Sequence, residues 1–115
     1  MEILDKSHIE SLGGLKCPEL VEIIEDFLSE LDKSLGELCQ LARDENHDDL
    51  RESAHRLKGG ASMSGFPALA EVAANLERLA QNRSSQISES EIARHFTTAI
   101  TEARAAFKEE LASLP

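Results

Sequence analysis

Apolar residues recur three or four positions apart along the segment after Pro18, and no other feature constrains the fold as strongly. The repeat runs through Leu20, Ile24, Phe27, Leu31, Leu35, Leu38 and Leu41 or Ala42. Such spacing places the apolar side chains on one face of a helix. Pro18 suits the first helical position, where its missing N–H costs nothing. We therefore predict one continuous helix from Pro18 to about Ala42.

Three later segments carry the same periodicity and are separated by short polar stretches. Their expected ranges are about His47 to Ser64, a helix that starts at Phe66-Pro67, and a helix that starts after Ser88. Gly65 follows the first of them in the position of a glycine C-cap. Ser88 and Glu91 have the spacing of a capping box at the start of the last. The four long segments predict antiparallel helices joined by short loops.

A shorter helix is expected from about Lys6 to Leu12, with Asp5 as its cap and Gly13-Gly14 as its stop. It is too short to be stable alone, so we expect it to lie across the bundle as a lid, with Lys6 and His8 solvated. The predicted fold is all-α: an up-and-down four-helix bundle with a short extra N-terminal helix. A chain of 115 residues has the size of one domain, and we expect residues 1–115 to form it.

The charge of the chain excludes several classes of function. Twenty-two acidic and 12 basic residues give a net charge of −10, which argues against binding to nucleic acid or to anionic lipid. There is no apolar run long enough to span a membrane. The N-terminal residues lack the basic start and the apolar segment of a signal peptide, so we expect none. We expect a cytoplasmic monomer. Cys17 and Cys39 do not make a disulfide framework and are expected to be reduced thiols.

The second of the four long segments, about His47 to Ser64, contains a histidine on its polar side. Its apolar residues Leu50, Ala54, Leu57 and Ala61 form one face. At about 100° per residue, His55 lies on the opposite face and should point into solvent. Lys58 and Gly59, three and four positions later, and Arg51, four positions earlier, fall on the same side. Gly59 leaves the imidazole open to a large partner, although glycine inside a helix is unfavourable by about 0.5–1 kcal/mol.

The run Ala54-His55-Arg56-Leu57-Lys58-Gly59, followed by Gly65, resembles the signature of histidine-containing phosphotransfer (HPt) domains. That signature has an alanine, the phosphorylated histidine, any residue, an aliphatic residue, a lysine and a glycine. A further glycine stands ten residues after the histidine, as Gly65 does here. The family is an all-helical bundle of about this length, so the resemblance covers nearly the whole chain.

The resemblance implies a phosphorelay intermediate. His55 would accept a phosphoryl group from the aspartate of one receiver domain, such as that of a hybrid sensor histidine kinase, and pass it to the receiver of a downstream regulator. Lys58 would compensate the phosphate charge. Mg²⁺ would belong to the partner receiver, so no cofactor and no ATP site are expected in this phosphocarrier, and the chain has no Walker loop.

The residues around His55 have less specific roles in this interpretation. Arg51 and Arg56 are placed to add positive charge near the phosphate, or are ordinary solvated residues. Gly59 would let the receiver approach. Ser62, with Met63, would lie at the edge of the docking face, which we expect to include the adjoining surface of the preceding helix.

Three alternatives stay open from the sequence. A helical module could bind receivers or a partner helix without accepting phosphate. A histidine-kinase dimerisation domain also exposes a phosphoacceptor histidine, but it expects an acidic residue directly after it, where this chain has Arg56. A metal site at His47 with the neighbouring acids is possible, but no paired ligand spacing supports it, so we predict no metal.

Overall fold

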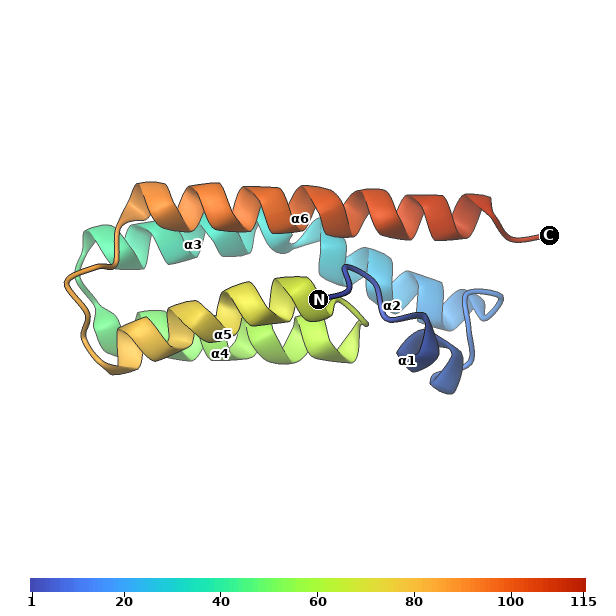
Figure 1. Cartoon of the computed structure of the whole chain (residues 1–115), viewed down its shortest axis with the longest axis horizontal. Helices are drawn as coiled ribbons and strands as arrows, with labels where there is room; N and C mark the ends of the chain where they lie inside the picture. Colours follow the sequence, from blue (N-terminus) through green and yellow to red (C-terminus); the bar gives the residue numbers. More distant parts are fainter.

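The computed structural model describes all 115 residues and contains six helices and no strands. The helices are α1 (Lys6–Ser11), α2 (Pro18–Ser29), α3 (Leu31–Arg43), α4 (His47–Met63), α5 (Pro67–Gln81) and α6 (Glu89–Ala112). Figure 1 shows α4 and α5 as an antiparallel hairpin, with α3 and α6 lying side by side over it. The predicted all-α bundle with a short additional helix at the N-terminus is confirmed.

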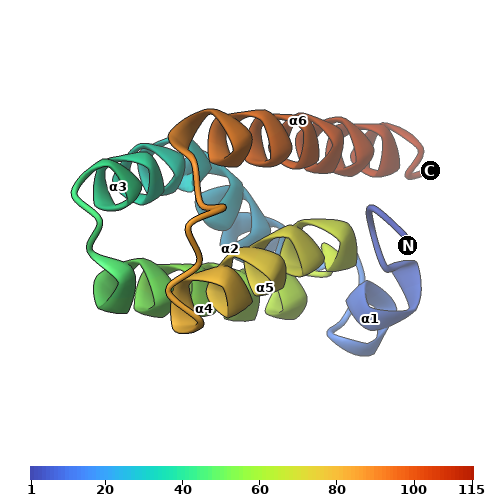
Figure 2. The same cartoon turned by 60° about the vertical axis from the view of Figure 1, so that its left-hand side comes forward.

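One prediction is wrong: the helix expected from Pro18 to Ala42 is interrupted at Glu30, which separates α2 from α3. The Ser29 hydroxyl donates a hydrogen bond to the carbonyl of Asp26 at 2.8 Å. In a continuous helix that carbonyl would accept from the N–H of Glu30, so the serine competes with the helical ladder. In Figure 2, α2 bends away from the direction of α3.

A side chain of α6 helps to stabilise the break between α2 and α3. The N–H of Glu30 turns to the carbonyl of Phe27 at 3.2 Å, a tighter 3₁₀-type bond. The Arg104 guanidinium of α6 donates to the Leu28 carbonyl at 2.7 Å. Because the last carbonyls of a helix lack partners inside it, this contact caps α2. This bond joins the end of α2 to α6. In Figure 1 the rest of α2 slopes away below the C-terminal half of α6.

The N-terminal segment fastens the turn between α4 and α5. The N–H of Asp5 donates to the carbonyl of Gly65 at 2.8 Å, and Ile9 is buried. Gly65 has φ +85°, and a Cβ there would lie 3.0 Å from the Ile9 side chain. Glycine is therefore needed both for the left-handed turn that ends α4 and for the close approach of α1.

Helix α1 has the predicted cap, because Asp5 Oδ1 accepts from the N–H of His8 at 3.1 Å. It covers one end of the bundle (Figure 1). Lys6 is 71% exposed, as expected, whereas His8 is half-buried. Nε2 of His8 lies 2.8 Å from the last carbonyl of α4, that of Met63, and Lys6 pairs with Glu110 of α6 at 2.8 Å. Each contact ties α1 to a helix distant in sequence.

A single cluster of 23 buried apolar residues forms the core, and most of them are Leu, Ile and Ala. The adjacent glycines Gly59 and Gly60 face it differently. A Cβ on Gly60 would lie 2.8 Å from Cε1 of Phe27, whose ring stacks against the buried Phe66 with centroids 6.2 Å apart. A Cβ on Gly59 would meet nothing within 4 Å. Gly60 therefore permits α2 to pack on α4, and Gly59 does not contribute to that packing.

This difference predicts opposite effects for two alanine substitutions. Gly59→Ala should stabilise the fold by about 0.5–1 kcal/mol, the ordinary helix-propensity gain. Gly60→Ala has the same gain, but overpacking against Phe27 should cost about 1–3 kcal/mol, so a net loss is expected. Urea unfolding followed by circular dichroism measures both. Equal stabilisation by the two substitutions would contradict the close contact between Gly60 and Phe27.

Candidate functional site

His55 stands on the outer surface of α4. The face of α4 directed to the core carries Leu50, Ala54, Leu57 and Ala61, all buried. The imidazole points away from them, and its side chain is 60% exposed. The predicted outward orientation is confirmed.

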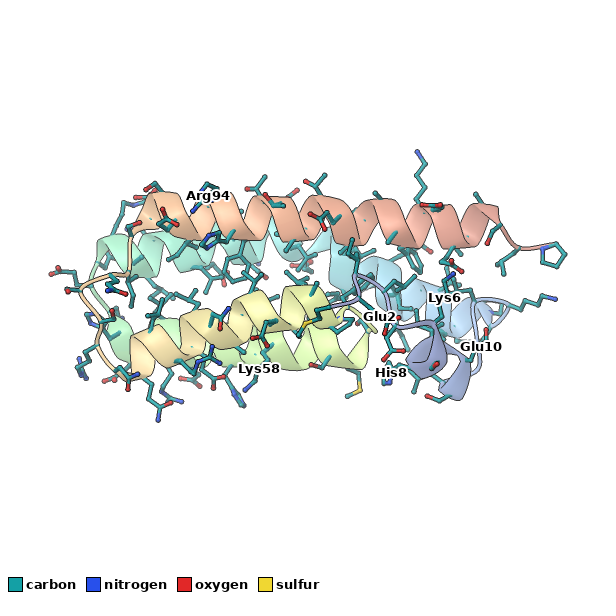
Figure 3. All side chains as sticks on the ribbon, in the orientation of Figure 1. Glu2, Lys6, His8, Glu10, Lys58 and Arg94 are labelled. Carbon is teal, nitrogen blue, oxygen red and sulfur yellow. The ribbon has the colours of Figure 1, made fainter.

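One carboxylate holds both the histidine and the lysine. Oε2 of Glu77, on α5, lies 2.7 Å from Nδ1 of His55, and Oε1 of Glu77 lies 2.6 Å from Nζ of Lys58. Glu77 itself is only 15% exposed and Lys58 34% exposed, so the contact lies partly within the seam between α4 and α5. Figure 3 shows Lys58 on the side of this hairpin turned away from α6.

The contacts of Glu77 with His55 and Lys58 determine which ring nitrogen of His55 carries the proton. The hydrogen bond from Lys58 lowers the pKa of Glu77 below its usual value of 4.5, and the hydrogen bond from His55 acts in the same direction. Glu77 is therefore ionised at neutral pH and can only accept hydrogen bonds. Nδ1 of His55 must then carry the proton. In the neutral ring, Nε2 is left with the lone pair, on the exposed side of the imidazole.

The remaining predicted residues lie around His55 without touching it. Arg51 and Ser62 are exposed on the outer face of α4, about one turn before and about two turns after His55. Arg56 is exposed, and its guanidinium donates to Ser53 Oγ at 3.3 Å, toward the groove between α3 and α4. No hydrogen bond or ion pair joins these three side chains to His55. Gly59 leaves open space beside the ring.

Sequence reasoning missed Glu77. The apolar pattern of α5 gives no reason to single out one of its glutamates. The signal lay in the hairpin. Because the turn at Gly65 joins two antiparallel helices of similar length, α4 and α5 pair residues at comparable distances from it. His55 is ten residues before Gly65, and Glu77 is twelve residues after it. Register counting would have found the carboxylate at the level of the histidine.

The motif, the exposed imidazole and the bundle agree with one comparison to known proteins. A model of the Hpt domain family matches residues 22–112. The chain belongs to the Hpt domain family. Domains of this family transfer phosphoryl groups through a histidine in phosphorelays, act as phosphocarriers rather than kinases, and interact with receiver domains. No curated protein and no solved structure matched the chain.

The match to the Hpt family begins inside α2, so α1 and the segment that fastens the α4–α5 turn lie outside it.

The structure contains no cluster of three metal-ligating side chains, and His47 lies in none. None of the helices combines the length and the apolar character that crossing a bilayer requires. Cys17 and Cys39 are not bonded to each other.

His55 and Lys58 lie outside the two main hollows of the structure. A groove of about 880 Å³ runs between α5 and α6, but neither His55 nor Lys58 lines it. A smaller polar hollow of about 370 Å³ between α3 and α4 includes Arg56 but not His55. Small substrates are usually enclosed in cavities of about 300–1,000 Å³. The open surface at His55 suits a reaction with a macromolecule.

Proposed function

We propose that this Hpt domain is a phosphorelay intermediate that accepts a phosphoryl group on His55 from a receiver aspartate and passes it to a second receiver. The observation that carries the proposal is the orientation of the imidazole. Nδ1 is held by Glu77 at 2.7 Å, which leaves the exposed Nε2 as the nucleophile.

The chemistry follows from that orientation. The Nε2 lone pair of His55 attacks the phosphorus of the aspartyl phosphate. A new N–P bond forms as the P–O bond to the aspartate breaks, and the carboxylate leaves with the electron pair. The ring becomes a phosphorylated imidazolium whose Nδ1–H remains directed at Glu77. Transfer onward reverses these steps with the aspartate of the second receiver. Such reactions need positioning and charge compensation more than covalent chemistry.

Lys58 is the cation that can follow the phosphate. It lies one turn from His55 on the same side of α4, and it is paired with Glu77 at 2.6 Å before phosphorylation. A phosphoryl group on Nε2 would offer oxygens that compete for the ammonium. Arg51 and Arg56 have less direct roles: both are exposed, and neither side chain contacts His55, Lys58 or Glu77.

The partners proposed here are receiver domains, one belonging to a hybrid sensor histidine kinase and one to a downstream regulator. Each receiver would bring the Mg²⁺ and the aspartate, and the Hpt domain would need no cofactor and no ATP site. We also propose that it acts as a cytoplasmic monomer. Its net charge of −10 supports the monomer, because like charges oppose self-association.

Transfer from phosphorylated receivers tests the proposal. A panel of receiver domains is labelled with ³²P on the aspartate and mixed with the purified chain. We expect rapid appearance of label on the chain, lost on mild acid treatment, because phosphohistidine is acid-labile. Label that survives acid, or no label from any receiver in a broad panel, would overturn the proposal.

Gly59 provides a test of access. Gly59→Leu should fold, because a Cβ there meets no atom within 4 Å. We expect transfer to slow by at least about tenfold, because a leucine side chain beside His55 would hold the receiver away and small displacements of reacting groups cost about a hundredfold. Gly59→Ala is the matched control and should retain most of the rate. Wild-type kinetics for Gly59→Leu would remove the argument for an open approach.

A further inference from the structure

The groove between α5 and α6 takes no part in the site at His55. Half-buried apolar side chains of the two helices and of the loop between them line it: Ala68, Val72, Leu79, Ile87 and Ala99. A partner that covered them would remove apolar surface from water. Figure 3 shows Arg94, which also lines the groove, on α6 and Lys58 on the opposite side of the α4–α5 hairpin. A molecule in the groove would therefore leave the surface around Lys58 uncovered.

The groove is long and narrow. Its lining on α6 extends from Ser88 to Ala103, which is about 22 Å at a rise of about 1.5 Å per residue. The volume of about 880 Å³ spread over that length leaves an average cross-section of about 40 Å². A single row of side chains has that width, whereas a whole helix is about 10–12 Å across. An occupant must therefore lie along the opening and insert one apolar stripe.

One end of the groove is acidic. Glu102 of α6 lines the groove there. Glu71 of α5 is exposed four residues before Asn75, which also lines the groove, so Glu71 and Asn75 lie on one stripe of α5. Because α5 and α6 are antiparallel, the start of α5 lies beside the later part of α6 (Figure 1). The two glutamates are therefore at the same end, and neither forms a salt bridge.

The opposite end carries positive charge. Arg78 of α5 donates a hydrogen bond to Oδ1 of Asn75 at the edge of the groove and forms no salt bridge. Arg94 of α6 pairs with Glu91 at 2.6 Å, and His95 lies 3.5 Å from the same carboxylate. The charges of Arg94 and Glu91 offset each other, so the Arg78 guanidinium is the uncompensated charge toward this end.

These charges discriminate among the occupants that apolar walls would accept. An acyl chain has one headgroup and could pair with only one end of the groove. An extended peptide would need hydrogen-bond partners for its backbone, but the backbone groups of α5 and α6 are bonded within their own helices. A second copy of the chain would bring a net charge of −10 against an equal charge. A helix brings a satisfied backbone and can carry a different charge at each end.

We infer that this groove docks an amphipathic helix of a partner protein. The helix inserts an apolar stripe between α5 and α6, places lysine or arginine beside Glu71 and Glu102, and places aspartate or glutamate beside Arg78. Stable helices have acidic residues in the first turn and basic residues in the last, because these complement the helix dipole. Such a helix would run in the same direction as α6. The inference goes beyond the proposed function and does not depend on phosphotransfer.

A synthetic helical peptide of about 16 residues is the probe, because that length spans the groove. It has leucines along one face, glutamates in its first turn and lysines in its last turn, and its binding to the full chain is measured by fluorescence anisotropy. A matched peptide with glutamates at both ends is the control. We expect the wild-type chain to bind the first peptide more tightly than the second.

Two leucine substitutions on α6 test the location. Ala99→Leu adds a side chain inside the groove, and Ala105→Leu adds the same side chain at an exposed position outside it. We expect Ala99→Leu to weaken peptide binding by at least about tenfold, because the leucine fills the space that the apolar stripe needs. Ala105→Leu should bind like the wild type. Both variants should unfold at the same urea concentration as the wild type, because the leucine of Ala99→Leu enters a hollow.

Two charge reversals test the acidic end and do not alter the apolar walls. Glu102→Lys should weaken binding about three- to tenfold at 50 mM NaCl and less than twofold at 500 mM NaCl, because salt screens exposed charges. Glu22→Lys makes the same change at an exposed position of α2 and should bind like the wild type.

Several results would overturn the inference. They are failure of the wild-type chain to bind the peptide, equal binding by the Ala99→Leu and Ala105→Leu variants, and equal binding by the two charge reversals. Dimerisation of the free chain that Ala99→Leu abolishes in sedimentation, or binding of palmitate in place of the peptide, would assign the groove to another occupant.

Discussion

Replacing His55 with glutamine is expected to reduce phosphoryl transfer from receivers by at least about a thousandfold, to the background of the assay, because no other side chain on this face supplies an imidazole nucleophile. The fold should not change. His55 is exposed and contributes nothing to the core, and the glutamine amide can still donate a hydrogen bond to Glu77. The rate is measured with ³²P-labelled receiver, and helix content is measured by circular dichroism.

A second histidine supplies the control. His95 is similarly exposed, at 55%, and lies near a glutamate, Glu91, at 3.5 Å, but it has no lysine beside it and stands on α6. His95→Gln should transfer at the wild-type rate. Label that persists on the His55→Gln variant and disappears from the His95→Gln variant would move the phosphoacceptor to α6.

The fold was predictable wherever a local signal existed. Pro18, Gly65 and the pair Ser88 with Glu91 mark helix ends through effects within one turn of the chain, and the structure places helix boundaries there. The break at Glu30 was missed because its cause is partly non-local. Ser29 weakens the helix by itself, but the freed carbonyl is satisfied by Arg104, far away in sequence.

The residues of the functional site were likewise predictable where they lie on one helix and not where a second helix supplies them. The exposure of His55 and its proximity to Lys58 and Gly59 follow from the geometry of one helix, so periodicity sufficed. Glu77 enters from a second helix, and only the register of the α4–α5 hairpin brings it to the ring. His8 likewise reaches the end of α4 through tertiary packing. Contacts between elements were invisible to patterns that describe one element at a time.

Replacing Glu77 with glutamine should slow transfer about 10- to 100-fold. In the phosphorylated imidazolium, Nδ1–H carries part of a positive charge, and a hydrogen bond involving a charged group contributes about 1.5–3 kcal/mol. Glutamine keeps the size of the side chain but lacks the negative charge of the glutamate. Glutamine also no longer fixes the tautomer of His55, because its amide can donate a hydrogen bond to Nδ1 as well as accept one from it. ¹⁵N NMR of the imidazole should therefore show protonation at Nδ1 in the wild type and a mixture in the variant.

The pH dependence of the free energy of unfolding tests Glu77 by a second measurement, which does not depend on phosphotransfer. The pKa of Glu77 is lowered in the folded chain, chiefly by Lys58, so its ionised form stabilises the fold. That stabilisation is complete above the ordinary carboxyl pKa of 4.5 and is lost as the pH falls through the lowered folded value. The free energy of unfolding of Glu77→Gln should then lie below that of the wild type at pH 7, and the gap should close below pH 4.5.

Glu71→Gln, on the same helix but away from the site, should show neither the slower transfer nor the closing gap. Transfer within twofold of wild type, with Nδ1 still protonated, would mean that Glu77 anchors Lys58 and does not position the histidine.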